Sequence, residues 1–167
     1  MKHKQSILPV DLNEDLRDER ADYLNTLLFI SALLSVLLYI TLAQFRQSDG
    51  GIQPQGFLIL AACTAVGYIL LKTKRVEVAA YAFLAGLTMC FGVQMSVGGP
   101  NAIAYALLIL PIAVASLTLD HGELITVTSL VSLSAIIFPS FAVGFGPSII
   151  PALIPIIIYA TIASIFY

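Results

Sequence analysis

The sequence predicts an all-α protein: a polytopic membrane bundle of six transmembrane helices with both termini in the cytoplasm. Of its 167 residues, 59% are hydrophobic and 11% are charged, whereas a soluble domain has about 45–50% apolar and about 25% charged residues. The stretch 124–167 contains no Asp, Glu, Lys, Arg or His. The apolar runs are continuous, which excludes a β-barrel, because barrel strands alternate polar and apolar residues.

The first predicted element is a polar leader, residues 1–22, which precedes the transmembrane domain, residues 23–167. Leu12, Leu16 and Tyr23 fall at helical spacing and predict a short amphipathic helix. This helix either lies at the cytoplasmic surface or runs straight into the first span. The first apolar run is longer than the roughly 7–15 residues of a signal-peptide core, so we expect a retained span.

Six apolar segments follow, each close to the roughly 20 residues that a helix needs to cross the hydrocarbon core. Polar stretches and Gly- or Pro-containing turns separate them. Pro111, Pro139, Pro151 and Pro155 lie within or near spans and predict kinks, because proline cannot donate the helical hydrogen bond. The predicted spans are residues 23–45, 56–71, 76–97, 102–119, 124–143 and 148–167.

The distribution of basic residues predicts the orientation. Loops on the cytoplasmic side of a membrane are enriched in Lys and Arg. Of the 8 Lys and Arg, all except Arg46 lie in the leader or in the cluster Lys72, Lys74 and Arg75. Placing the leader inside puts both groups in the cytoplasm, and six spans then return the C-terminus to the same side.

Chemistry-bearing residues are scarce in the predicted spans. Charged residues inside a membrane are functional candidates, because burying them there is expensive, yet Glu77 lies only at the start of the third span. His3 is in the leader and His121 in a short loop, and Cys63 and Cys90 sit in apolar segments as small buried side chains. We therefore expect no catalytic residues, no metal site, no cofactor and no nucleic-acid partner.

The turn between the third and fourth spans gathers polar groups around Gly98, Gly99 and Pro100. The candidate site residues are Gln94, Asn101 and Tyr105. Two interpretations stay open. The amides and the phenol can orient a small ligand, or the motif is ordinary turn chemistry with Gln94 bonded to a neighbouring helix.

A second polar stretch, Asp120-His121-Gly122-Glu123, separates the fourth and fifth spans. It is either a surface contact for a partner or a turn between helices. In the second interpretation Gly122 supplies the bend and Glu123 stabilises the start of the next helix through its dipole.

The run Ser96-Val97-Gly98-Gly99-Pro100-Asn101-Ala102-Ile103-Ala104-Tyr105, the apolar stretch to Ala113 and the turn at 120–123 together resemble a bacterial pattern. It is similar to the N-terminal membrane regions of multi-pass sensor histidine kinases and diguanylate cyclases. The resemblance covers about residues 70–140 and carries over no catalytic residue. It implies a non-catalytic sensory or anchoring module for signal transduction in the bacterial inner membrane, with a kinase or cyclase domain after the sixth span.

Two other functions stay open. The chain is alternatively an accessory or structural subunit of a larger respiratory or photosynthetic membrane complex, since a subunit that only packs needs no intramembrane charge. A third hypothesis is a transporter of an uncharged solute through Pro-kinked helices. In each case we expect the partners to be the lipid bilayer and other membrane subunits or further copies of the chain.

Overall fold

The computed structural model describes residues 10–44, 53–98 and 102–166, and the regular structure of these residues is entirely helical. The predicted all-α class is therefore confirmed. The helices in chain order are α1 (Val10–Gln44), α2 (Pro54–Lys72), α3 (Val76–Gly98), α4 (Ala102–Leu107), α5 (Ile109–Thr118), α6 (His121–Val143) and α7 (Phe145–Phe166).

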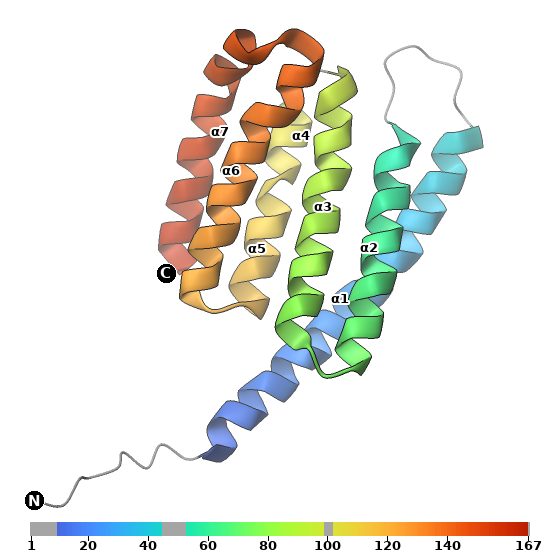
Figure 1. The fold of residues 1–167 in the computed structure, drawn as a ribbon, viewed down its shortest axis with the longest axis vertical. Coiled ribbons are helices and arrows are strands. Elements are labelled where there is room, and N and C mark those ends of the chain that lie inside the picture. The colour runs from blue at the N-terminus through green and yellow to red at the C-terminus, as the bar shows by residue number, and fades with distance from the viewer. Residues whose placement is uncertain (1–9, 45–52, 99–101, 167) are drawn as a thin grey trace, which may run out of the picture.

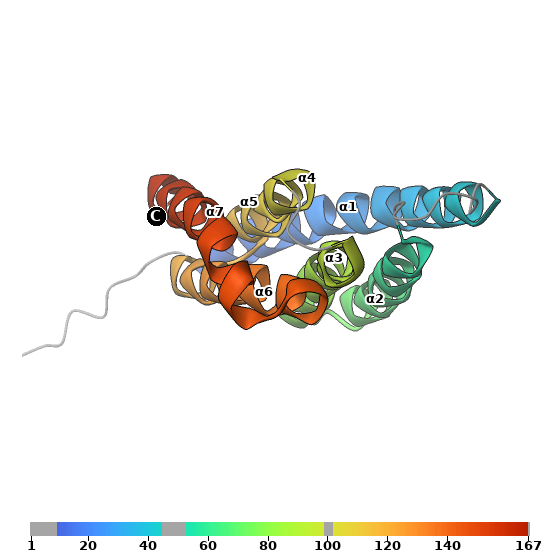
Figure 2. The ribbon, with the colours of Figure 1, turned by 90° about the horizontal axis from the view of Figure 1, so that it is seen from above.

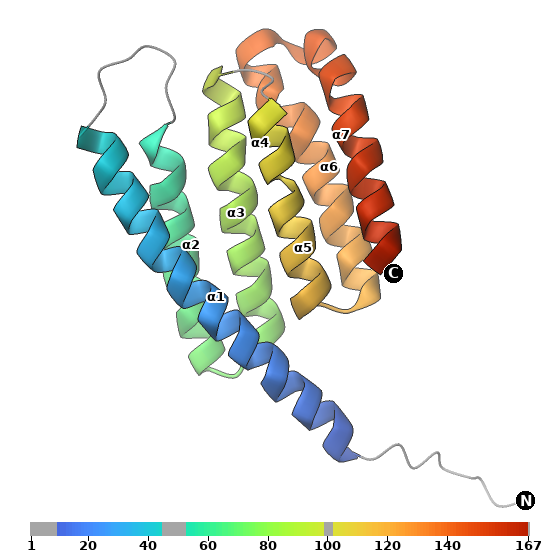
Figure 3. The ribbon, with the colours of Figure 1, turned by 180° about the vertical axis from the view of Figure 1, so that it is seen from behind.

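The leader and the first predicted span form a single helix in the described residues. α1 continues from Val10 to Gln44 without a break at residue 22. The candidate membrane span within it is Asp18–Gln44. Figure 3 shows the N-terminal part of α1, here called the stem (residues 10–17), projecting beyond the other helices. Of the two options that the sequence left open, the described part of the leader takes the direct run into the span.

Five helices are long and apolar enough to cross a membrane: α1 from Asp18 onward, α2, α3, α6 and α7. α2, α6 and α7 begin before the predicted starts at 56, 124 and 148. In α2 and α6 the added residues include Pro54 and Glu123, and a first helical turn accepts both proline and an acidic side chain.

The segment predicted as one span, residues 102–119, is helical with one local irregularity, and Ile103–Thr118 forms an apolar helical stretch shorter than the other spans. This segment is divided into the short helix α4 and the helix α5, with Leu108 between them. Pro111 gives the physical reason, because it has no N–H for the carbonyl of Leu107 and its ring crowds that carbonyl. The Leu108 N–H is shared between the carbonyls of Ala104 at 3.1 Å and Tyr105 at 3.2 Å, as in a tightened turn.

α3 lies at the centre of the bundle and contacts α1, α2, α4, α5 and α6. Figures 1 and 2 show α2 on one side of it and α6 followed by α7 on the other. α1 crosses the back of the bundle at an angle to the remaining helices (Figure 3). The turns α2–α3 and α5–α6 share one end of the bundle, where α1 also begins, and α7 ends near it (Figure 1).

Glycines hold α2 and α3 close together. A Cβ atom on Gly56 would lie 2.7 Å from the backbone oxygen of Cys90, and one on Gly86 would lie 2.6 Å from the Cβ of Cys63. Close backbone approach through small residues is a main source of packing energy between helices in lipid, where leucines gain little by leaving the acyl chains. Small residues therefore let the backbones of α2 and α3 approach closely.

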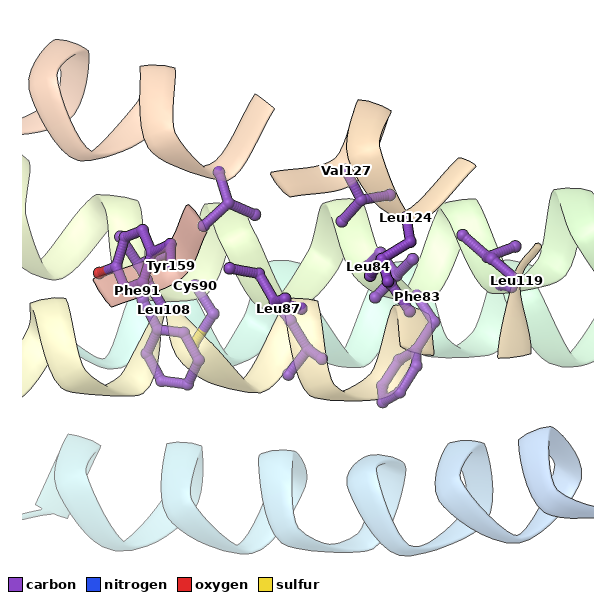
Figure 4. Close-up of a cluster of buried hydrophobic side chains, with 14 of the residues drawn as sticks. Phe83, Leu84, Leu87, Cys90, Phe91, Leu108, Leu119, Leu124, Val127 and Tyr159 are labelled. Carbon is purple, nitrogen blue, oxygen red and sulfur yellow. The ribbon is translucent and has the colours of Figure 1, made fainter. Parts of the chain in front are cut away.

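The other face of α3 carries the apolar core. Phe83, Leu84 and Leu87 on α3 lie among side chains from the α4–α7 part of the chain, including Leu124 and Val127 of α6 (Figure 4). All of these are buried. The core therefore fixes α3 and α6 relative to each other and positions the polar groups at both ends of the bundle.

Candidate functional site

The structure separates the candidate residues of the turn between α3 and α4. Asn101 lies outside the described residues. Gln94 is half-buried near the end of α3, and Tyr105 is buried on α4. The hydrogen bonds of Gln94 and Tyr105 lead to different neighbours, so their contacts do not define one shared site.

Gln94 binds the main chain at the start of α2. Its Nε2 donates to the Gln53 carbonyl oxygen at 2.8 Å, and its Oε1 accepts the Gln53 N–H at 2.7 Å. Gln53 is the residue that precedes α2, with extended backbone (φ −81°, ψ 116°). The side chain thus forms a two-bond latch between α3 and the N-terminus of α2. This is the helix-to-helix hydrogen bond of the second interpretation, and a ligand role for Gln94 stays a prediction.

Tyr105 lies at the break between α4 and α5. Its backbone carbonyl accepts the hydroxyl of Tyr159 from α7, and both side chains are buried. The Tyr105 hydroxyl itself is buried with no hydrogen-bond partner among the described residues. Carbonyls freed by a broken helix are commonly re-satisfied by side chains of neighbouring helices. The Tyr105 carbonyl also accepts the Leu108 N–H at 3.2 Å, so Tyr159 adds a second hydrogen bond at the irregular turn, and sequence reasoning did not single it out.

The turn Asp120–Glu123 caps α6. Asp120 is the N-cap residue and Glu123 the third residue of the helix, and their side chains and backbone N–H groups face each other in a capping box. The Asp120 N–H donates to Glu123 Oε2 at 3.3 Å. The Asp120 carboxylate also receives Arg20 Nη1 of α1 at 2.8 Å. This stretch therefore forms the turn before α6 and also attaches α1 to α6 through the ion pair of Arg20 with Asp120. No sequence pattern predicted this ion pair.

The hydroxyl-bearing residues of the fifth predicted span serve the helix itself. Thr126, Thr128 and Ser129 donate to carbonyls four residues earlier, and Ser134 donates to Val131. Such internal bonds satisfy a hydroxyl in an apolar environment without directing it toward a ligand.

An apolar groove of about 440 Å³ runs between α3 and α6. Two of the hydroxyl groups in its lining already donate to backbone carbonyls of their own helix. Thr88 donates to the Leu84 carbonyl at 2.9 Å, and Ser134 donates to the Val131 carbonyl at 2.7 Å. The groove thus offers mainly apolar surface. Its lining includes Leu84, Met89, Val127, Leu130, Ile137 and Phe138.

Neither cysteine is in a disulfide: Cys90 is buried and Cys63 is half-buried. Among the residues that the structure describes, no group of three or more His, Cys, Asp or Glu side chains is placed to hold a metal ion. No family model, curated protein or solved structure matches this chain.

Proposed function

We propose that this chain is a non-catalytic sensory and anchoring module of a bacterial signal-transduction protein, with six passes through the inner membrane and both termini cytoplasmic. The observation that supports it most is the form of α1. This helix runs unbroken from the stem into the apolar span, so a rigid-body displacement of its membrane part also displaces the stem.

The attachments of α1 suit a movable element. Only 11% of its most apolar stretch is buried, against 56% for α3. Its one ion pair among the described residues, Arg20 with Asp120, joins side chains that are 39% and 74% exposed. Exposed pairs of this kind contribute about 0–1 kcal/mol. A signal therefore has little polar energy to overcome when it shifts α1 relative to α6.

The charge distribution supports the proposed orientation. The stem and the α2–α3 turn lie toward one end of the bundle (Figure 1), and they contain Arg17, Lys74 and Arg75. Because cytoplasmic loops are enriched in Lys and Arg, these residues support the proposal that this end faces the cytoplasm. The shorter pair α4 and α5 then counts as the fourth crossing, which brings α7 back toward the cytoplasm.

The switch itself requires two packings of α1 that bind the signal with different affinities, since a ligand shifts an equilibrium only by its differential binding. A change in lipid surroundings satisfies this requirement in principle, because α1 presents Phe29, Leu33 and Leu37 outward. The output passes through α7 or through the stem to a cytoplasmic domain.

Isolation of the tagged chain from its own membranes tests the proposal, with intact mass and co-purifying chains as the readout. We expect a larger polypeptide that contains a kinase or cyclase domain, or a stoichiometric complex with such a domain. A mature chain of 17.9 kDa that purifies alone contradicts the proposal. The same mass held by respiratory or photosynthetic subunits replaces it with the accessory-subunit function.

A further inference from the structure

A polar groove of about 500 Å³ opens between α1 and the α2–α3 turn, away from the sites described above. Its walls come from two separate parts of the chain and carry opposite charges. The α1 wall has carboxylates and the other wall has ammonium groups. The lining residues are Asp18, Ala21, Asp22, Asn25, Leu71, Lys72, Lys74 and Val76.

Helical spacing builds the acidic wall. Asp18 and Asp22 are four residues apart, with Asn25 three residues further, so all three lie on one stripe of α1. Arg20 lies off this stripe and reaches Asp120 instead. The two carboxylates therefore face the groove without an adjacent arginine on the same stripe.

The basic wall is built by the end of α2. The Arg75 N–H donates to the Leu70 carbonyl at 3.1 Å and the Lys74 N–H to the Leu71 carbonyl at 2.9 Å, which is the Schellman pattern. Lys74 has the left-handed backbone (φ 60°) that this pattern requires and that glycine adopts most easily. A lysine in this place brings an ammonium group to the groove at the expense of backbone strain.

Two further features strengthen the positive wall. The Lys72 ammonium lies 5.2 Å from the centre of the Tyr68 ring, which restricts its position. α3 begins at Val76, which lines the groove, and the N-terminus of a helix favours an anion.

The groove is placed at the depth of lipid head groups. The apolar run of α1 begins after Asp22, α2 ends at Lys72 and α3 begins at Val76. Ala21, Leu71 and Val76 add apolar lining to the charged walls. A molecule that fills the groove therefore meets charge on two sides and apolar surface beside it.

We propose that this groove binds the head group of a phospholipid that carries a primary ammonium beside its phosphate, as phosphatidylethanolamine does. The phosphate lies against Lys72 and Lys74, and the ammonium donates to Asp18 and Asp22. The acyl chains follow the exposed apolar surface of the neighbouring helices. A purely anionic lipid satisfies the lysines but meets two carboxylates that repel it, which explains the preference for the zwitterion. This site does not depend on the proposed signalling role.

Native mass spectrometry of the purified full chain tests the proposal, with equal amounts of phosphatidylethanolamine and phosphatidylglycerol in the detergent micelle. We expect the wild type to retain the ethanolamine lipid about tenfold more, in line with one charge-assisted hydrogen bond. Asp22→Asn should abolish this preference while binding of phosphatidylglycerol persists. Lys72→Gln should weaken both lipids about tenfold.

Two matched controls lie at the same end of the bundle but do not line the groove. Glu77→Gln removes an acidic charge and Arg75→Gln a basic one, and both should keep the wild-type preference. Equal retention of the two lipids by the wild type, or an unchanged preference in Asp22→Asn, overturns the proposal. Inorganic phosphate that displaces the lipid at millimolar concentration shows instead a site for free anions, and overturns it too.

Discussion

α1 and α3 are both apolar helices long enough to span a membrane, yet they have opposite places in the bundle. Of the five such helices in the described chain, α3 has the most buried apolar stretch, at 56%, and α1 the least, at 11%. α1 is nevertheless the more hydropathic of the two. Hydropathy thus identifies both as membrane helices but does not rank them by burial.

Residue size explains the difference. α3 presents Ala79, Ala80, Gly86 and Gly92 to its neighbours, and all are buried. α1 presents large apolar side chains outward, and burying them against protein gains little when lipid chains are equally apolar. The centre of a membrane bundle is therefore the helix that others can approach closely. α3 is the scaffold of this fold, and α1 is attached to it.

The largest effect should come from enlarging a glycine at the α2–α3 contact. Gly56→Ala places a methyl group where the backbone oxygen of Cys90 is 2.7 Å away and Gln94 Nε2 is 3.3 Å away. A backbone oxygen cannot turn aside, so α2 must move outward. We expect a loss of about 1–3 kcal/mol of stability, measured by denaturant-induced unfolding in micelles.

Gly146→Ala is the matched control, because a Cβ at Gly146 meets nothing within 4 Å. It should leave stability unchanged or raise it slightly, since alanine has the higher helix propensity. Equal losses for Gly56→Ala and Gly146→Ala would show that close approach to α3 does not set the stability of this bundle.

Breaking the latch between α3 and α2 should have the next largest effect. Gln94→Leu removes both hydrogen bonds to Gln53 and should cost about 1–2 kcal/mol. Hydrogen exchange at the start of α2 should accelerate at the same time. Gln55→Leu, at an exposed position in the first turn of α2, is the control. It should change neither the stability nor the hydrogen exchange. A stable Gln94→Leu with unchanged exchange contradicts the latch.

Tyr159 and Tyr105 should respond differently to the same chemical change, the loss of the phenol hydroxyl, when stability is measured. Tyr159→Phe deletes the hydroxyl that donates to the Tyr105 carbonyl near the break between α4 and α5, at a cost of about 0.6–1.7 kcal/mol. Tyr105→Phe deletes a buried hydroxyl with no partner in the described residues and should be neutral or stabilising. Thermal unfolding of both variants measures the two losses of stability. A larger loss for Tyr105→Phe than for Tyr159→Phe would contradict the assignment of the stabilising hydrogen bond to the Tyr159 hydroxyl.

Sequence reasoning predicts the helical class and the location of the apolar segments, because composition and run length depend only on local sequence. Pro111 predicted a kink in the span over residues 102–119, but the sequence did not show that the helix is interrupted at Leu108, since proline inside a span produces either a kink or a break depending on neighbours. Sequence reasoning placed Gln94 and Tyr105 in one cluster because they are near in sequence. Their partners Gln53 and Tyr159 are remote in sequence, and only the packed bundle brings them together.

The smallest effect should come from the attachment of α1. Arg20→Gln and Asp120→Asn each remove the ion pair of 2.8 Å, and partial exposure limits the loss to about 0.2–1 kcal/mol. The two changes should be non-additive in a double-mutant cycle, since both remove one interaction. Asp18→Asn, on another stripe of α1, should be additive with Asp120→Asn. A coupling energy for Arg20 and Asp120 as large as the cost of Gly56→Ala would make α1 part of the scaffold, and the contrast between the two helices would then fail.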